Sequence, residues 1–251
     1  MKQDVSIIYE DEWMFAVNKP ARVASVPSEG IMLHRTMLGI VQEFCLARGD
    51  TAVPYLLHRI DMQTSGLLLF GKHERDREKL EPILIQKDTH KKYTTLVKGI
   101  PRGSVITAKV KARTSDVHVF AQTNYKVIRV YKILGTAVSL VEAEIKTGRK
   151  HQIRQHFSTI KCPVVMDPEY GDFEFNRKFR VTFRLGRMFL HSSSIEFMHP
   201  FLERVVKIQA PLPLDLESAL EKIIDPKIFA PIRDHHLKKP NPRRKNFTRR
   251  R

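Results

Sequence analysis

Hydrophobic and polar positions along the chain follow two rhythms, one typical of strands and the other of helices. Two short apolar runs with strand-like composition flank an acidic turn within residues 5–17, and a continuous apolar run covers residues 67–70. In residues 34–48, five apolar residues share one face at helical spacing: Met37, Leu38, Val41, Phe44 and Cys45. The N-terminal part therefore predicts strands around a helix.

Strand-like segments dominate the middle of the chain, with Gly and Pro between them. Expected strands cover 91–100, 105–112, 125–134 and 137–146, and an expected β-hairpin joins 193–200 to 204–211. Expected helices cover 74–87, with a kink or an end at Pro82, then 150–160 and 213–224. This order predicts an α+β fold, a large mixed, mainly antiparallel β-sheet with flanking helices.

Charge narrows the class of protein. The 251 residues carry a net charge of +17, and 42% are hydrophobic, enough for a sizeable core. An excess of Lys and Arg favours an acidic partner, most often nucleic acid. No apolar run approaches the roughly 20 residues of a membrane span, and the N-terminus lacks a signal-peptide pattern. We therefore expect a cytoplasmic protein without membrane contact.

The two cysteines and the basic C-terminal segment add two further expectations. Cys45 and Cys162 stand far apart, which argues against a disulfide framework and a zinc site. From Lys238 onward, KKPNPRRKNFTRRR contains eight basic residues and no acid. We expect one domain over 1–233 and a basic, disordered tail over 234–251. The tail is either a phosphate-gripping arm or a solubilising end.

Candidate chemistry gathers in three polar segments, HRID at 58–61, HKKY at 90–93 and TGRKHQIRQH at 147–156. On a helix, four residues of the third segment fall close to one face: Lys150, Ile153, Arg154 and Phe157. An Arg on an apolar face needs a partner, and Asp61 is the carboxylate in an equally unusual setting. Such a pair would keep Asp61 ionised in a pocket, as a nucleophile or base requires. The alternative is a turn-forming or capping Asp61 with solvated basic residues.

Several segments closely resemble motifs of the RluA family of pseudouridine synthases. They occur in the order of the family over about residues 5–220: NKP (18–20), HRIDMQTSGLLLFGK (58–72), KKYTTLVKG (91–99), TGRKHQIRQH (147–156), DPEYG (167–171) and RMFLHSSSIEFMHP (187–200). The resemblance implies the pseudouridine synthase catalytic fold, in a member without the N-terminal S4 module of many relatives. Met166 replaces a usual Gly before DPEYG, so this turn is a candidate for a local difference.

The resemblance implies isomerisation of uridine to pseudouridine in structured RNA, without a small-molecule cofactor or metal. Asp61 would be the essential carboxylate and Arg154 its ion-pair partner. Tyr93 would pack on the target uracil, with a further role in removal of the C5 proton left open. Base flipping costs a few kcal/mol, and stacking on an aromatic ring returns about 1–3 kcal/mol. The segment at 170–176 favours ribosomal RNA as substrate, although transfer RNA is possible. A monomer is the expected state.

Further residues are assigned to substrate binding. Arg59 would hold the flipped nucleotide out of its stack, and Leu67 and Ile153 would be pocket walls or plain core. The others are His58, Thr64, Lys91 and Arg149, with Arg22, Lys109, Lys111, Arg113 and Lys150 as further phosphate contacts.

Two other functions compete with the isomerase. One is a non-catalytic RNA-binding or ribosome-assembly protein, against which the joint presence of Asp61, Tyr93 and Arg154 argues. The other is an RNA hydrolase with His58 and Asp61 as bases, which would need a metal or a second carboxylate.

Overall fold

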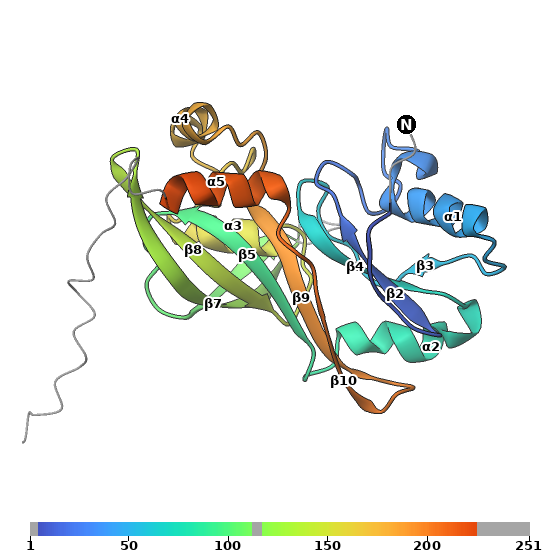
Figure 1. Cartoon of the computed structure of the whole chain (residues 1–251). Coiled ribbons are helices and arrows are strands. Elements are labelled where there is room, and N and C mark those ends of the chain that lie inside the picture. Colours follow the sequence, from blue (N-terminus) through green and yellow to red (C-terminus); the bar gives the residue numbers. More distant parts are fainter. Residues whose placement is uncertain (1–4, 112–116, 225–251) are drawn as a thin grey trace, which may run out of the picture.

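One twisted sheet organises the part of the chain described by this computed structural model, residues 5–111 and 117–224. Its strands follow the order β1-β2-β4-β9-β5-β8-β7-β6, with β10 beside β9 and β3 beside β4 (Figure 1). Their bounds are β1 (Ile7–Glu10), β2 (Met14–Lys19), β3 (Tyr55–Leu56), β4 (Ser65–Gly71), β5 (His90–Lys98), β6 (Val105–Lys111), β7 (His118–Ile133), β8 (Thr136–Ile145), β9 (Leu190–His199) and β10 (Arg204–Gln209). The expected α+β architecture is confirmed.

The sheet consists of two halves that meet where β4 runs parallel to β9; the other strand pairs of the described residues are antiparallel. At this junction Gly66 lies opposite Ser192. Its φ is +111°, and a Cβ there would lie 2.2 Å from the carbonyl oxygen of Ser192. Only glycine permits this conformation and this approach, which explains the Gly after Thr64 and Ser65.

Five helices and three 3-10 turns flank the sheet within the described residues. They are α1 (Met37–Arg48), α2 (Arg77–Leu80), α3 (Gln152–Thr159), α4 (Phe173–Phe183) and α5 (Leu214–Ile224), with η1 (Leu33–Arg35), η2 (Glu74–Asp76) and η3 (Glu81–Leu84). Pro82 lies in η3, so the helix expected over 74–87 breaks there. Helix α4 was not expected, because FEF at its start has the alternation of a strand. Its buried Phe175, Phe179 and Phe183 nevertheless follow helical spacing.

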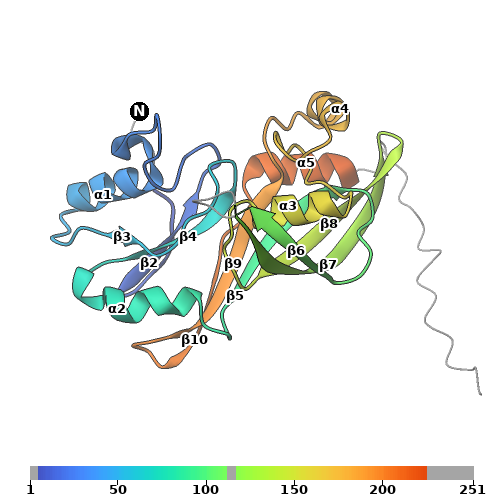
Figure 2. The same ribbon diagram turned by 180° about the vertical axis from the view of Figure 1, so that it is seen from behind.

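Helices cover both faces of the sheet. Helix α1 packs through Met37, Val41 and Cys45 against one face of the N-terminal half, and α2 with η3 packs against the other. Helix α3 lies in the curve of β6 and β7, where Phe157 meets Tyr125 edge to face at 5.4 Å (Figure 2). Helices α4 and α5 share one apolar cluster with the end of β7 and the start of β8. This packing brings the start of α3 beside the loop that precedes β4.

Two sequence expectations remain, one on the basic C-terminal tail and one on membrane-spanning segments. The basic tail lies outside the described residues, as does Arg113. Within the described residues, no helix is long and apolar enough to cross a membrane.

Candidate active site

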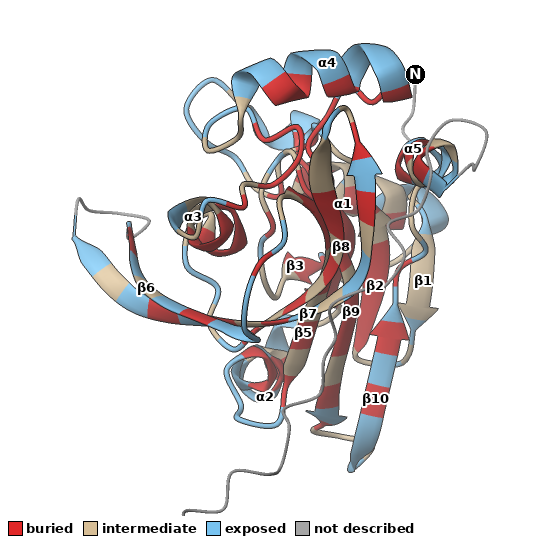
Figure 3. Cartoon of the chain, turned by 90° about the vertical axis from the view of Figure 1, so that its left-hand side faces the viewer, coloured by how far each residue is buried: buried red, intermediate tan, exposed pale blue. Residues whose placement is uncertain are grey.

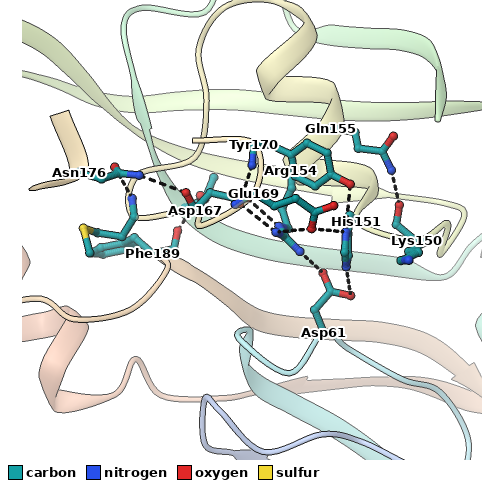
Figure 4. A network of polar contacts seen from close by, with 12 residues as sticks. Asp61, Lys150, His151, Arg154, Gln155, Asp167, Glu169, Tyr170, Asn176 and Phe189 are labelled. Atoms are coloured by element: carbon teal, nitrogen blue, oxygen red, sulfur yellow. Dashed lines mark hydrogen bonds and ion pairs between the residues drawn. The ribbon is translucent and has the colours of Figure 1, made fainter. Parts of the chain in front are cut away.

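Asp61 lies in the loop between β3 and β4, with its side chain directed toward the start of α3 (Figure 4). The backbone N–H of Thr64 donates to the Asp61 carbonyl at 3.0 Å, so the loop is a tight turn. The carboxylate lies within 4 Å of the side chains of Arg154 and His151, and 22% of the Asp61 side chain is exposed. This setting is that of the ion-paired alternative for Asp61, and a ligand can reach the carboxylate.

Arg154 connects this carboxylate to the core. Its guanidinium Nη1 lies 3.7 Å from Asp61 Oδ2, which confirms the expected ion pair. A closer pair was not expected: Arg154 binds Asp167 through Nε at 2.6 Å and Nη2 at 2.9 Å. The bidentate bond to Asp167 fixes the plane of the guanidinium and leaves Nη1 for Asp61.

Asp167 is a fully buried acid and the main residue that sequence reasoning missed. Its carboxylate also accepts the backbone N–H groups of Glu169 and Tyr170, at 2.9 and 3.0 Å. Burial raises the pKa of Asp167, but the bonds from Arg154 and from the backbone outweigh it and hold this pKa below its usual value. An acid directly after the buried run Val164, Val165, Met166 was the available signal for a buried ion pair.

His151 is the second residue that the sequence did not single out. It precedes α3 in the left-handed conformation, at φ +51°, and its Nε2 lies 3.9 Å from Asp61 Oδ1. Its Nδ1 lies 3.2 Å from the Tyr170 hydroxyl. Burial lowers the pKa of His151, and the charge of Asp61 partly opposes this effect. Asp61 is thus held between Arg154 and a histidine whose proton it can influence.

A small cavity of about 50 Å³ opens over Asp61. Its lining comes from both halves of the sheet and from the start of α3: Arg59, Ile60, Asp61, Thr64, Tyr93, Ile145, Gly148, Arg149, His151, Gln152, Ile153, Arg154 and Leu190. Burial and the Asp61 charge raise the pKa of Tyr93 to about 12, so its hydroxyl stays protonated near neutral pH. The three residues assigned to catalysis therefore share one cavity.

Four of the residues assigned to substrate binding also line this cavity. Ile153 forms part of its buried wall, and Arg59 and Arg149 lie exposed at its rim. Thr64 is 2% exposed, and its hydroxyl has no hydrogen-bond partner among the described residues. A buried hydroxyl that lines a cavity without a partner suits a polar ligand.

The structure places three other predicted binding residues outside the cavity. Leu67 is fully buried on the opposite face of β4, in the cluster beneath α2. Lys91 donates its ammonium to the carbonyl oxygen of Leu84 at 2.9 Å, so it is a structural lysine and not a phosphate contact. His58 accepts the N–H of Leu69 at 3.1 Å, and burial and the charge of Lys91 lower its pKa to about 3. Membership of a motif therefore does not by itself place a side chain in the cavity.

Two further residues shape the backbone around the cavity. Lys19 is fully buried, and its ammonium donates to the carbonyl oxygens of Pro20 and Val23 at 2.8 and 2.7 Å. Burial lowers the pKa of Lys19 to about 7, although the charge of Asp61 opposes this. Met166 adopts a left-handed φ of +63°, so this position keeps a conformation that favours glycine.

Other parts of the described structure are weaker candidates for a binding site than the cavity over Asp61. No group of three His, Cys, Asp or Glu side chains within the described ranges could hold a metal ion. A larger hollow of about 320 Å³ lies beside α1. Its cations Arg48 and Lys72 are both paired with Glu10, at 2.9 and 2.7 Å, which leaves little charge for a ligand.

Comparisons with known proteins agree with this geometry. Residues 14–159 match the family model described as RNA pseudouridylate synthase. Among relatives, a tRNA pseudouridine synthase C of Vibrio cholerae is 32% identical, over 83% of this chain and 91% of its own. A ribosomal large subunit pseudouridine synthase C of the same organism is 31% identical, over 86% and 69%. The solved human RNA pseudouridylate synthase domain containing 1 shares the fold, with a TM-score of 0.69, 20% identity, and 87% and 89% coverage.

Proposed function

The chain belongs to the family of RNA pseudouridylate synthases, and from this premise we propose that its cavity isomerises uridine to pseudouridine with Asp61 as the essential carboxylate. The observation that carries the assignment is the position of Asp61, which shares a cavity with Tyr93 while Arg154 lies 3.7 Å from it. The enzyme is therefore an isomerase that acts on RNA.

Each cavity residue has a role that follows from its surroundings. The uridine leaves its stack, and its base enters against the ring of Tyr93. Asp61 then attacks the sugar C1′ or the base, or removes a sugar proton. The glycosidic bond breaks, the uracil turns, and its C5 joins C1′. Arg154 orients the carboxylate throughout, because Asp167 fixes the guanidinium from behind.

The remaining groups bind and position the nucleotide. The Tyr93 hydroxyl, with its pKa near 12, acts as a hydrogen-bond donor in preference to a base. The unpartnered Thr64 hydroxyl bonds to a polar atom of the base or sugar. Because the cavity holds only about 50 Å³, an incoming base displaces the exposed side chains of Arg59 and Arg149 at its rim.

The proposal also covers the substrate RNA, the domain bounds, the oligomeric state and the location of the enzyme. The substrate is structured RNA, ribosomal RNA before transfer RNA; relatives named for either RNA support the class and not the choice. The catalytic domain spans 1–233, and the basic segment 234–251 adds phosphate contacts. The enzyme works as a monomer in the cytoplasm without a small-molecule cofactor.

The first experiment measures tritium release from [5-³H]uridine-labelled ribosomal and transfer RNA transcripts. We expect release by the wild type, and a loss of at least about a thousandfold in Asp61→Asn, because an amide can neither attack nor accept a proton in this way. Asp88→Asn, at an exposed position, is the matched control and should retain full activity.

The outcomes separate the competing functions. Tight RNA binding without release from any transcript would replace the isomerase with the non-catalytic RNA-binding protein. An active Asp61→Asn variant would leave the isomerase activity assigned but would show that Asp61 is not its essential carboxylate.

A further inference from the structure

Helix α4 presents a stripe of arginines on its exposed side. Phe173, Arg177 and Arg180 follow one another within α4 at spacings of four and three residues, which places them on one side of the helix. Arg184 follows four residues later as the C-cap of the helix, at φ +55°. All four are exposed, and Phe173 is 69% exposed. Figure 3 shows α4 at the edge of the molecule, with its outer side exposed along its length. We call Arg177, Arg180 and Arg184 the arginine stripe.

The arginine stripe has little neutralising charge within the described part of the chain. None of its three guanidiniums forms a hydrogen bond or an ion pair with a described residue. Arg177 lies near the charge of Glu174, but Glu174 pairs with Lys178 at 2.8 Å. Elsewhere in this segment an arginine is paired: Arg187, three residues after the stripe, forms a bidentate pair with Asp215. Three unpaired guanidiniums in a row suit an anionic partner.

The N-terminal half of α4 is attached directly to the candidate active site. Asn176 accepts the N–H of Met166 at 2.8 Å and donates to the carbonyl oxygen of Asp167 at 3.1 Å. Asp172 caps the helix by accepting the N–H of Phe175 at 2.9 Å. The helix is therefore fixed relative to the carboxylate that orients Arg154.

The C-terminal end of α4 leads to the other side of the same site. Gly186 follows the stripe by two residues, and its carbonyl oxygen accepts a bond from the Arg22 guanidinium at 2.7 Å. The backbone N–H of Arg22 donates to the carbonyl oxygen of Met62 at 2.7 Å, one residue beyond Asp61. The arginine stripe is thus connected at both of its ends to the residues that surround the cavity.

We propose that the arginine stripe binds consecutive backbone phosphates of the RNA strand that flanks the nucleotide in the cavity; this inference rests on the proposed function. Along the axis, Arg177 and Arg184 are separated by about 10 Å at 1.5 Å per residue. A nucleic-acid strand in a duplex carries a charge about every 3.4 Å, so about three phosphates fit this length. The exposed ring of Phe173, at the start of the stripe, suits stacking on an unpaired base.

The test compares full-length wild type with the triple variant Arg177→Gln, Arg180→Gln, Arg184→Gln. RNA affinity is measured by fluorescence anisotropy at several salt concentrations, with ribosomal and transfer RNA transcripts as probes. We expect Kd to rise at least about tenfold near 0.1 M salt, and the slope of log Kd against log salt to fall by about 2, since each phosphate contributes about 0.7. In tritium release, KM should rise with little change in kcat.

The matched control removes three charges at the opposite end of the molecule. Arg75→Gln, Lys87→Gln, Lys207→Gln changes exposed residues near α2 and on β10 by the same net charge. It should leave the salt slope within about 0.5 of wild type. Circular dichroism and thermal unfolding of both variants verify that each is folded.

Two results would overturn the proposal. One is an unchanged salt slope in the triple variant. The other is an equal loss of slope in the control, because net charge alone would then explain the effect. Failure of the proposed function is a separate result. If the wild type released no tritium from any RNA, the isomerase would fall, while the binding measurements would still decide whether the arginine stripe contacts phosphates.

Discussion

Arg154 determines the geometry of the site at the scale of single residues. It is 4% exposed and bears a full charge, so its stability in the core depends on the carboxylates around it. Asp167 supplies two short bonds from the buried side, and Asp61 lies at 3.7 Å on the cavity side. The structural acid and the proposed catalytic acid thus share one cation, and a change in the first must alter the second.

Asp167→Asn is expected to lower both stability and activity. Arg154 loses its bidentate partner, and a buried charge without its partner costs about 3–5 kcal/mol of unfolding free energy. The guanidinium is then drawn toward Asp61 and no longer orients it. Denaturant unfolding and tritium release measure the two effects.

Glu169→Gln is the matched control for this prediction. Glu169 contacts the same guanidinium at 3.3 Å, but 53% of its side chain is exposed, so its pair with Arg154 is worth at most about 1 kcal/mol. Equal losses of stability in the two variants would mean that Asp167 does not hold Arg154 in the core.

At the scale of elements, a buried polar network joins β4, β9 and α5. Arg187, just before β9, donates to the Ser65 hydroxyl on β4 at 3.1 Å and forms a bidentate pair with Asp215 on α5, at 2.6 and 2.8 Å. The network crosses the parallel junction of the two sheet halves. Helix α5 therefore fastens this junction in addition to covering apolar surface.

Asp215→Ala is expected to lower the unfolding free energy by about 1–3 kcal/mol. Arg187 is buried and would lose its partner, but Asp215 is half exposed, so the loss is below that of a fully buried pair. Glu217→Ala removes an acid from the same first turn of α5 at an exposed position, and should cost less than about 0.5 kcal/mol. If both variants lost the same stability, a helix-dipole effect would account for it and the network would not.

At the scale of the whole molecule, the fold buries histidine side chains in their neutral form, which lowers their pKa. His191 is fully buried on β9, where its Nδ1 lies 3.0 Å from the Ser65 hydroxyl and its Nε2 lies 3.2 Å from the carbonyl oxygen of Ala210. A carbonyl only accepts, so Nε2 carries the proton and Nδ1 is the acceptor. Burial and the nearby charge of Arg187 lower the pKa of His191 to about 4.

Stability is therefore expected to fall as the pH falls from about 6.5 to about 4. The unfolded chain takes up a proton near pH 6.5, while folded His191 takes it up only near 4, so protonation favours the unfolded state throughout this window. The contribution of His191 is at most about 3 kcal/mol, from 1.36 kcal/mol per pKa unit. His58, with its pKa near 3, extends the loss to lower pH.

Unfolding free energies measured between pH 4 and pH 8 check this prediction. His191→Gln should be less stable at pH 8 but should lose less stability on acidification, whereas exposed His34→Gln should follow the wild-type profile. A His191→Gln profile as steep as that of wild type would assign the acid sensitivity to other groups.

The sequence by itself determined the class of fold and most of its elements. Strand and helix periods, the hairpin at 193–211 and the break at Pro82 follow from local rules, because each element buries a face that its own residues specify. The sequence also determined the family and the candidates Asp61, Tyr93 and Arg154, since their motifs are contiguous. Helix α4 was missed because the alternation at its start resembles a strand.

Only the tertiary structure decided which polar residues meet. Arg154 and His151 lie beside Asp61, and Asp167 holds Arg154 from the other side, because the parallel junction of β4 with β9 and the packing of α3 bring distant segments together (Figure 4). Leu67 points away from the cavity, since neighbouring strand residues alternate between faces. His58 and Lys91 sit in or beside the same motifs, but they bond to the backbone of Leu69 and Leu84. Spacing along a chain indicates which residues can share a face. Which faces meet, and which carboxylate neutralises a buried arginine, is set by long-range packing.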